Sequence, residues 1–360
     1  MSKLFKQQTH KKMVGIYSHS TPHKIQHYPN EQSTFTTIFE FDGVPKNDVL
    51  IKCSCLGCLN PKCMKFTSEE LTLNDERLSD FPVDADDSVC PLDAIVWERG
   101  FHVPSVITDR CINCGICARR CPIGAIYSNG ANAVIHSGES CVNFLPVSEK
   151  NLTKHLEQIN ALSKCQHDGV YIEPNDKSIA TLYTKLNEQQ TKSQFPNLII
   201  RNLFLVLGNQ CIMRRRGDIY FRIDAILADK PTIGVAEVEF NKDSLESPRA
   251  ILDDIAVLVS RYEIEKIQIK PFIISLEFPN IRTEYWRVIR DIKDVLGVRI
   301  NSLSLGALCI LVWRFIFAPI GKVDFYADVD SPSIKAAMAK VCGDLQIADI
   351  TNFAVIEPKK

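Results

Sequence analysis

The sequence lacks several features that would assign its class at once. It has almost no net charge, because 42 basic and 43 acidic residues leave a formal charge of −1. Bulk charge therefore gives no reason to expect nucleic acid or an anionic membrane, and any such contact must come from a local patch. With 45% hydrophobic and 24% charged residues among 360, the chain is not mainly disordered, collagenous or coiled-coil, and its length predicts about two domains.

Long apolar segments are missing as well. The most apolar run, 303–320, is interrupted by Gly306, Arg314 and Pro319 and falls short of the roughly 20 apolar residues of a membrane span. We expect this run to form protein core and expect no membrane partner. Residues 1–30 contain no apolar stretch followed by a small-residue cleavage site, as a secretory signal would, so the sequence predicts a cytoplasmic protein.

No glycine-rich fingerprint for a flavin or nicotinamide cofactor is present either, but cysteine is abundant. Nine of the 14 Cys lie between Cys53 and Cys121. Because cytoplasmic thiols are kept reduced, these cysteines are not expected to form a disulfide framework. Metal is the natural alternative.

The sharpest motif is the run C-x2-C-x2-C-x3-C-P from Cys111 to Pro122. Three thiolates within seven residues can wrap one face of a [4Fe-4S] cubane, whereas a fourth Cys followed by Pro points to a neighbouring cluster. The small residues Gly115 and Ala118 let the backbone close on the inorganic sulfides. This run is typical of bacterial ferredoxins.

A looser copy of the motif lies upstream. Cys90-Pro91 repeats the Cys-Pro exit, and Cys55, Cys58 and Cys63 give C-x2-C-x4-C, with Cys53 as an alternative first ligand. The span from about 53 to 127 thus resembles a two-cluster ferredoxin module with an enlarged first half. Structural zinc is the alternative for paired C-x2-C units, although zinc does not explain the repeated exits.

In the two-cluster ferredoxin family the clusters are ligated crosswise. Carried over to this chain, the resemblance implies two [4Fe-4S] clusters and eight Cys ligands. One cluster would be held by Cys90, Cys111, Cys114 and Cys117, and the other by Cys55, Cys58, Cys63 and Cys121.

The second half has the pattern of an α/β fold. Apolar residues at a 3.6 period predict a helix over 199–213, and β-rich runs predict antiparallel strands over 219–227 and 233–240. Further helices and strands are expected at 248–261, 267–278, 283–296 and 298–305. The fold class is therefore predicted to be α+β, with a polar segment 1–45, a two-cluster ferredoxin-like domain 46–150, a connector 151–196 containing helices near 153–162 and 179–187, and an α/β sandwich 197–360.

Acidic residues stand on the two neighbouring strands. Period 2 places Glu237 and Glu239 on one face of their strand, and Asp224 lies in the middle of the preceding one. An unpaired buried carboxylate is costly, so a divalent cation, Mg²⁺ or Mn²⁺, is the simplest way to hold three of them together. The alternative is that both glutamates face solvent and pair with Arg222 or Lys242.

This arrangement resembles the restriction-endonuclease-like PD-(D/E)xK nuclease superfamily, in which an Asp on one strand and a (D/E)-x-K on the next bind the metal. The resemblance covers about 197–300. It implies Asp224 and Glu237 as metal ligands, with Asp218 as second choice for the first acid, and Glu239 where the family usually has Lys. The catalytic residues would be Asp224, Glu237 and Glu239, acting in metal-assisted hydrolysis of DNA phosphodiester bonds.

These patterns leave more than one function open. The first is an iron-sulfur-containing, divalent-metal-dependent DNA endonuclease of the restriction or phage-defence kind, whose basic run 214–216 could neutralise phosphates. A homodimer is then the default, because two strands need two active sites. The second is a ferredoxin-type electron-transfer protein whose C-terminal domain docks a redox partner. A binding module without catalysis is the third, because Glu239 departs from the usual Lys.

Overall fold

The computed structural model describes residues 61–98, 103–121, 126–128, 133–135, 172, 174–241, 244–327, 330–343 and 353–359, with short strands at 16–18 and 51–53. The chain divides into two compact units. The first unit comprises Met1–Lys65 and Asp93–Tyr171, and the second comprises Phe66–Leu92 and Ile172–Lys360.

A five-stranded mixed sheet forms the centre of the second unit. Its strands lie in the order β11-β10-β9-β8-β7. Neighbours among β7, β8 and β9 are antiparallel, whereas β9, β10 and β11 run parallel. The strands are β7 (Gln210–Met213), β8 (Ala225–Asp229), β9 (Thr232–Glu239), β10 (Ile269–Ser275) and β11 (Asn301–Ser304).

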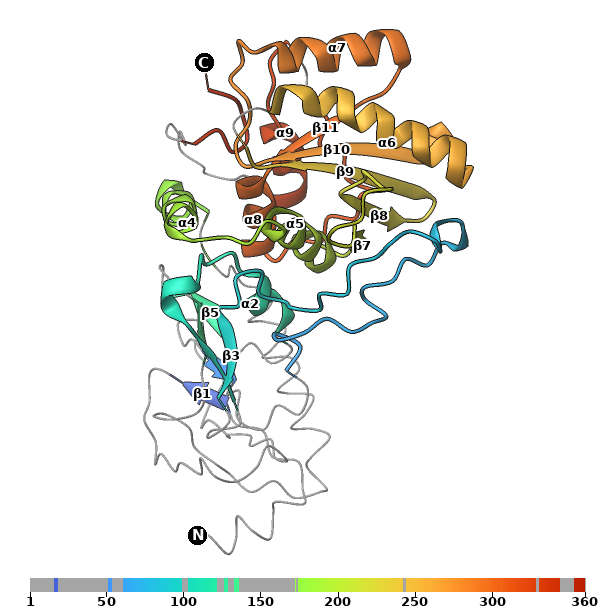
Figure 1. Cartoon of the computed structure of the whole chain (residues 1–360). Coiled ribbons are helices and arrows are strands. Elements are labelled where there is room, and N and C mark those ends of the chain that lie inside the picture. Colours follow the sequence, from blue (N-terminus) through green and yellow to red (C-terminus); the bar gives the residue numbers. More distant parts are fainter. Residues whose placement is uncertain are drawn as a thin grey trace, which may run out of the picture. The chain divides into compact units, whose positions relative to one another are not determined.

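Helices cover both faces of this sheet. Figure 1 shows α6 and α7 on one face, and α5 and α8 on the other. Helices α6 and α7 connect the parallel strands, as such crossovers require. The bounds are α4 (Asp176–Glu188), α5 (Phe195–Val206), α6 (Ser247–Tyr262), α7 (Glu284–Leu296), α8 (Leu305–Trp313) and α9 (Lys335–Cys342).

Most of the apolar run at 303–320 forms core: residues 303–313 are buried as predicted, whereas Phe317 is 67% exposed. All nine residues of α8 are buried, so this helix is apolar on every side. The Ser304 hydroxyl caps the helix by accepting a hydrogen bond from the Ala307 N–H at 3.0 Å, which satisfies a donor that would otherwise be buried without a partner. Among the described residues, no helix is long and apolar enough to cross a membrane.

One strand begins later than its sequence suggests. The prediction of a strand over 219–227 is wrong in its first half, because β8 begins at Ala225 and Asp224 therefore precedes the strand instead of lying in its middle. The Asp218 carboxylate accepts hydrogen bonds from the N–H groups of Tyr220 and Phe221 at 2.9 and 3.1 Å. Such local bonds compete with strand pairing.

The predicted helix over 199–213 is wrong at its end. Helix α5 stops at Val206, and Gln210–Met213 form β7, which the sequence reading missed. Gly208 has a φ of +93°, a left-handed conformation that glycine adopts without the steric cost of a Cβ atom. The break at Gly208 turns the chain from the helix into the sheet.

The other elements predicted for the second half lie near their expected positions. These are α4, α6, β9, β10, α7 and β11. The helix predicted near 153–162 lies outside the described residues. Helix α4 lies inside the stretch predicted as a connector, and the segment 66–92 groups with the second unit. The predicted domain limits stay a prediction.

Within its described residues, the first unit contains three short antiparallel strand pairs and a one-turn helix. Helix α2 (Ile116–Arg120) follows Gly115, whose φ is +87°. The pairs are β1 (Ile16–Ser18) with β2 (Ile51–Cys53), β3 (Ile95–Glu98) with β4 (Val103–Val106), and β5 (Ile126–Ser128) with β6 (Ala133–Ile135).

Candidate metal centre and iron-sulfur segment

Asp224 is held in place at the start of β8. Its Oδ1 accepts a hydrogen bond from Asn197 Nδ2 on α5 at 3.0 Å, and its Oδ2 accepts one from the Val238 N–H on β9 at 3.1 Å. Arg214 Nη2 lies 3.5 Å from Oδ1. Burial raises the pKa of Asp224, although these hydrogen bonds and the Arg214 charge act in the opposite direction.

Glu237 and Glu239 lie on the same face of β9, as the alternation of the strand predicts. Both side chains are half-buried, whereas Ala236, before Glu237, and Val238, between the two glutamates, are buried. Burial raises the pKa of Glu237 to about 8, and the charges of Asp224, Asp254 and Glu239 contribute further. The structure therefore brings Glu237 into an acidic environment.

Asp254 on α6 is a member of this group that the sequence reading missed. The residue is only 3% exposed, and its Oδ2 is buried without a hydrogen-bond partner among the described residues. Burial, followed by the charge of Asp224, raises the pKa of Asp254 to about 7. The sequence could have indicated its burial, because Asp254 stands on the apolar face of an amphipathic helix between Ile251 and Leu258.

The remaining predicted partners are engaged elsewhere. Arg222 lies 3.8 Å from Asp253, with both side chains exposed, so this ion pair contributes little and does not neutralise the glutamates. Glu239 Oε1 accepts a hydrogen bond from the Asn241 N–H at 2.8 Å. Lys242 lies outside the described residues. Asp218, the second choice for the first acid, shapes the turn before β8.

A polar cavity of about 630 Å³ adjoins Asp224 and Glu239, whereas Glu237 and Asp254 are not among the residues that line it. Asp224 and Glu239 line it together with Arg214 and Lys192. Its other walls carry mainly amide, hydroxyl and aromatic side chains, namely Asn187, Gln189, Thr191, Ser193, Phe195, Asn197, Phe240 and Asn241. The cavity therefore combines carboxylates with cationic groups that could contact an anionic ligand.

The acids fit a divalent cation by their chemistry. Asp224, Glu237 and Asp254 supply oxygen ligands of the kind that Mg²⁺ and Mn²⁺ prefer, and their mutual repulsion and raised pKa values would be relieved by a positive charge. In the described part of the chain, no three His, Cys, Asp or Glu side chains are grouped tightly enough to hold a metal ion as they stand. A divalent cation at these acids therefore stays a prediction.

The cysteine motif folds as a tight turn followed by α2. Asn113 and Gly115 both have positive φ values, +61° and +87°, so the chain curls between the cysteines. Cys111 Sγ accepts a hydrogen bond from the Ala133 N–H at 3.4 Å, and backbone N–H groups near sulfur are what an anionic cluster requires. Cys114, Cys117 and Cys121 are buried. The residues present therefore suit a thiolate-held cluster.

The segment around Cys63 is hydrogen-bonded to α2, the helix that ends directly before Cys121. Arg120 Nε donates to the Lys62 carbonyl at 2.7 Å, and Nη2 donates to the Lys65 carbonyl at 3.2 Å. Both segments belong to the first unit. The crosswise assignment of Cys63 and Cys121 to one cluster stays a prediction, because Cys55 and Cys58 lie outside the described residues.

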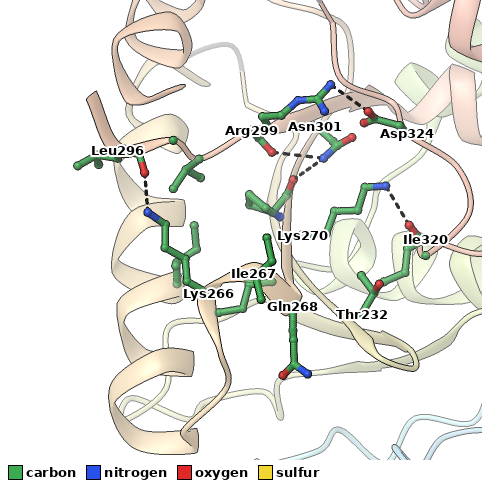
Figure 2. Close-up of a pocket in the computed structure, with 16 residues that line it drawn as sticks. Thr232, Lys266, Ile267, Gln268, Lys270, Leu296, Arg299, Asn301, Ile320 and Asp324 are labelled. Carbon is green, nitrogen blue, oxygen red and sulfur yellow. Dashed lines mark hydrogen bonds and ion pairs between the residues drawn. The ribbon is translucent and has the colours of Figure 1, made fainter. Parts of the chain in front are cut away.

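A second cavity, of about 650 Å³, lies at the beginning of the parallel strands. Figure 2 shows Lys266, Lys270 and Arg299 at its wall. Their charged groups contact the protein itself: both lysines donate to backbone carbonyls, of Leu296 and Ile320 respectively, and Arg299 pairs with an aspartate, Asp324. Because these cations are already engaged, we assign this cavity no ligand.

Comparisons with known proteins bear on the cysteine-rich segment. Residues 104–127 match the model of the 4Fe-4S binding domain family. An uncharacterized ferredoxin of Methanocaldococcus jannaschii is 34% identical over 97 residues, which make up 26% of this chain and 61% of that protein. The chain thus spans less than two thirds of this curated relative. No solved structure matches the chain.

These matches establish that the chain carries a ferredoxin-like iron-sulfur segment with a [4Fe-4S] cluster. The number of clusters stays a prediction. The matches agree better with the electron-transfer hypothesis than with the nuclease hypothesis, to which they lend no support.

Proposed function

We propose that this chain joins a ferredoxin-like iron-sulfur segment to a divalent-cation-dependent phosphodiesterase site that acts on DNA. The observation that carries the proposal is the carboxylate of Asp254, which is buried beside Asp224 and Glu237 and has an Oδ2 without a hydrogen-bond partner among the described residues. Buried carboxylates that repel one another are expected where a cation binds. Further support comes from the antiparallel pairing of β8 with β9, which places Asp224, just before β8, next to the part of β9 that carries Glu237.

Each acid has a separate task in this mechanism. A bound cation would supply a Lewis acid and would lower the pKa of a coordinated water. Asp224 and Glu237 would hold the cation, and Asp254 would complete the ligand set from α6. Glu239, on the cavity wall, would orient the water. Arg214 and Lys192 line the same cavity. Because Arg214 is already engaged by Asp224 and the Phe221 carbonyl, Lys192 would position the phosphate of the substrate by charge.

The test compares cleavage by variants of the full chain purified without oxygen. With Mg²⁺ or Mn²⁺, the wild-type chain is expected to cut plasmid DNA, whereas Asp224→Asn and Glu237→Gln should each be slower by about 100-fold or more, because they lose several kcal/mol of transition-state stabilisation. Asp253→Asn is the matched control, since it removes an exposed acid one residue from Asp254. Equal cleavage by all of these proteins would refute the proposal.

Electron transfer is the second candidate, and the printed name of the ferredoxin relative favours it. Here the cluster would exchange electrons with a partner that docks on the second unit. Stoichiometric reduction by dithionite, followed by electron transfer to a soluble acceptor at the same rate in wild type and Asp224→Asn, would support this function. A cluster that resists reduction would argue against it.

A further inference from the structure

The loop 215–222, between β7 and β8, exposes two large apolar side chains that are neighbours in the sequence. Ile219 is 82% exposed and Tyr220 is 81% exposed. A single apolar residue on a protein surface needs no explanation, but apolar side chains that gather on an exposed surface mark a place where another molecule binds. We therefore examined what holds this loop and which charges surround it.

Local contacts fix the second half of the loop. The Asp218 carboxylate accepts hydrogen bonds from the N–H groups of Tyr220 and Phe221 at 2.9 and 3.1 Å. The Phe221 ring packs edge-on against Phe81, with 5.8 Å between the ring centroids, and its centroid lies 6.5 Å from that of Tyr262. The exposure of the two residues before Phe221 is thus a property of an ordered loop.

The first half of the loop is held by residues 82–84, which belong to the same unit. The Arg215 N–H donates to the Pro82 carbonyl at 2.7 Å, and the Arg216 N–H donates to Asp84 Oδ2 at 3.2 Å. Both arginines are exposed. Their side chains therefore extend into solvent from backbone positions that are already fixed.

The exposed surface of the loop carries positive charge beside its apolar residues. Arg215 Nη2 lies 3.6 Å from Asp218 Oδ2, but the arginine side chain is 65% exposed, so this ion pair contributes little and a phosphate can replace it. The Asp218 side chain is only 8% exposed and is used by the N–H groups of its own turn. Exposed arginines next to an aromatic ring are typical of surfaces that bind single-stranded nucleic acid, because the cations contact phosphates and the ring stacks on a base.

The loop leads directly into the acid site. Arg214 joins the two, because its Nη1 donates to the Phe221 carbonyl and its Nη2 lies 3.5 Å from Asp224 Oδ1. Tyr220 stands four residues before Asp224, and at about 3.5 Å per residue their Cα atoms are at most about 14 Å apart. At a rise of about 3.4 Å per nucleotide along one strand, this distance covers about four nucleotides. A strand bound at the acids would therefore bring its neighbouring bases within reach of the loop.

We propose that the loop 215–222 binds the DNA strand beside the phosphate that is cleaved. Tyr220 stacks on an unpaired base and Ile219 contacts the next base, while Arg215 and Arg216 contact the adjacent phosphates. The substrate class is then DNA with unpaired bases at the cleavage site, because a base inside an intact stack offers no face to a tyrosine ring. The choice of DNA as ligand rests on the proposed function, which this inference makes more specific.

The test measures DNA binding by the full chain, purified without oxygen and kept in EDTA so that nothing is cleaved. Fluorescence anisotropy with labelled oligonucleotides compares a single strand, an intact duplex and a duplex with a central unpaired bubble. Wild type should bind the single strand and the bubble more tightly than the intact duplex. Tyr220→Ala should weaken binding to the single strand by about tenfold, as expected for the loss of one stacked base, and Tyr220→Phe, which keeps the ring, should restore it.

Two further variants separate charge from stacking and provide the control. Arg216→Ala should weaken binding to all three oligonucleotides and reduce the dependence of the affinity on salt, because it removes a phosphate contact. Ile267→Ala is the matched control, since Ile267 is 89% exposed but lies just before β10, whose residue Ile269 pairs with Ile233 at the start of β9, away from Glu237. Its affinities should equal those of wild type.

The outcomes distinguish the loop from the acid site. Equal wild-type affinity for the single strand and the intact duplex, or wild-type affinities in both Ile219→Ala and Tyr220→Ala, would overturn the role of the loop. If Tyr220→Ala abolishes self-association in sedimentation but leaves DNA binding unchanged, the loop contacts a second copy of the chain and the inference is wrong. Binding that depends on the loop, without cleavage in Mg²⁺ or Mn²⁺, would refute the proposed function and support the loop as a DNA contact.

Discussion

At the residue scale, the acids show what a sequence can predict and where such prediction stops. Asp224, Glu237 and Glu239 were expected together because strand alternation places them on adjacent strands, and the structure places Asp224 and Glu237 within electrostatic reach of one another. Asp254 stands on α6, 15 residues beyond Glu239 in the sequence. Its inclusion depends on how α6 packs on β9, which no local pattern specifies.

The raised pKa values of Asp254 and Glu237 predict a pH-dependent stability. The pKa of Asp254 rises from 3.8 to about 7 and that of Glu237 from 4.5 to about 8. At a pH between the ordinary and the raised pKa of each group, the folded chain retains a proton that the unfolded chain has released. Without a cation, the free energy of unfolding should therefore fall as pH rises from about 4 to 8. Asp254→Asn should be more stable than wild type at pH 8, by about 1 to 3 kcal/mol.

Chemical denaturation in EDTA at pH 5 and pH 8 measures this effect. Asp253→Asn, exposed on the same helix, should follow the wild-type profile, because an exposed carboxylate loses little on folding. A wild-type stability that does not change between the two pH values would show that the buried acids do not repel one another as described.

At the scale of elements, the sequence predicted helices and long strands better than the boundaries between consecutive elements. The apolar period of 199–213 continues across the end of α5 into β7, so periodicity alone does not reveal the break. Gly208 marks it by its backbone conformation, and an added Cβ there would lie 2.6 Å from Cδ1 of the Phe317 ring. The glycine can be read from the sequence, but its close approach to Phe317 cannot.

Gly208→Ala and Gly217→Ala form a matched pair that separates backbone strain from crowding. Both glycines have positive φ values, +93° and +80°, but an added Cβ at Gly217 would meet no atom within 4 Å. Each substitution should cost about 1 to 2 kcal/mol for the left-handed backbone. Gly208→Ala should cost more, because Phe317 must move. Thermal denaturation measures the difference, and a smaller loss for Gly208→Ala than for Gly217→Ala would contradict this account.

At the scale of the whole molecule, the motif spacing predicts which cysteines bind iron, but it does not predict to which unit the chain between them belongs. Residues 66–92, which separate the two cysteine groups, belong to the second unit. Their attachment depends on buried contacts with α5, such as those of Arg201 and Asn202, over sequence separations of more than 100 residues. An insertion of ordinary composition therefore gives no sign that it packs on α5 of the second unit.

Iron stoichiometry tests the two-cluster arrangement of the whole chain. Crosswise ligation predicts about eight iron and eight sulfide per chain after reconstitution, and about four of each in Cys121→Ser, because that change removes a ligand from only one of two cubanes. Cys90→Ser should also leave about four, on the other cluster, whereas the double variant should retain neither cluster intact. Cys342→Ser, a buried thiol on α9, is the control and should match wild type. About four iron in wild type, unchanged by Cys121→Ser, would mean that Cys121 is not an iron ligand and that a single cluster accounts for the motif.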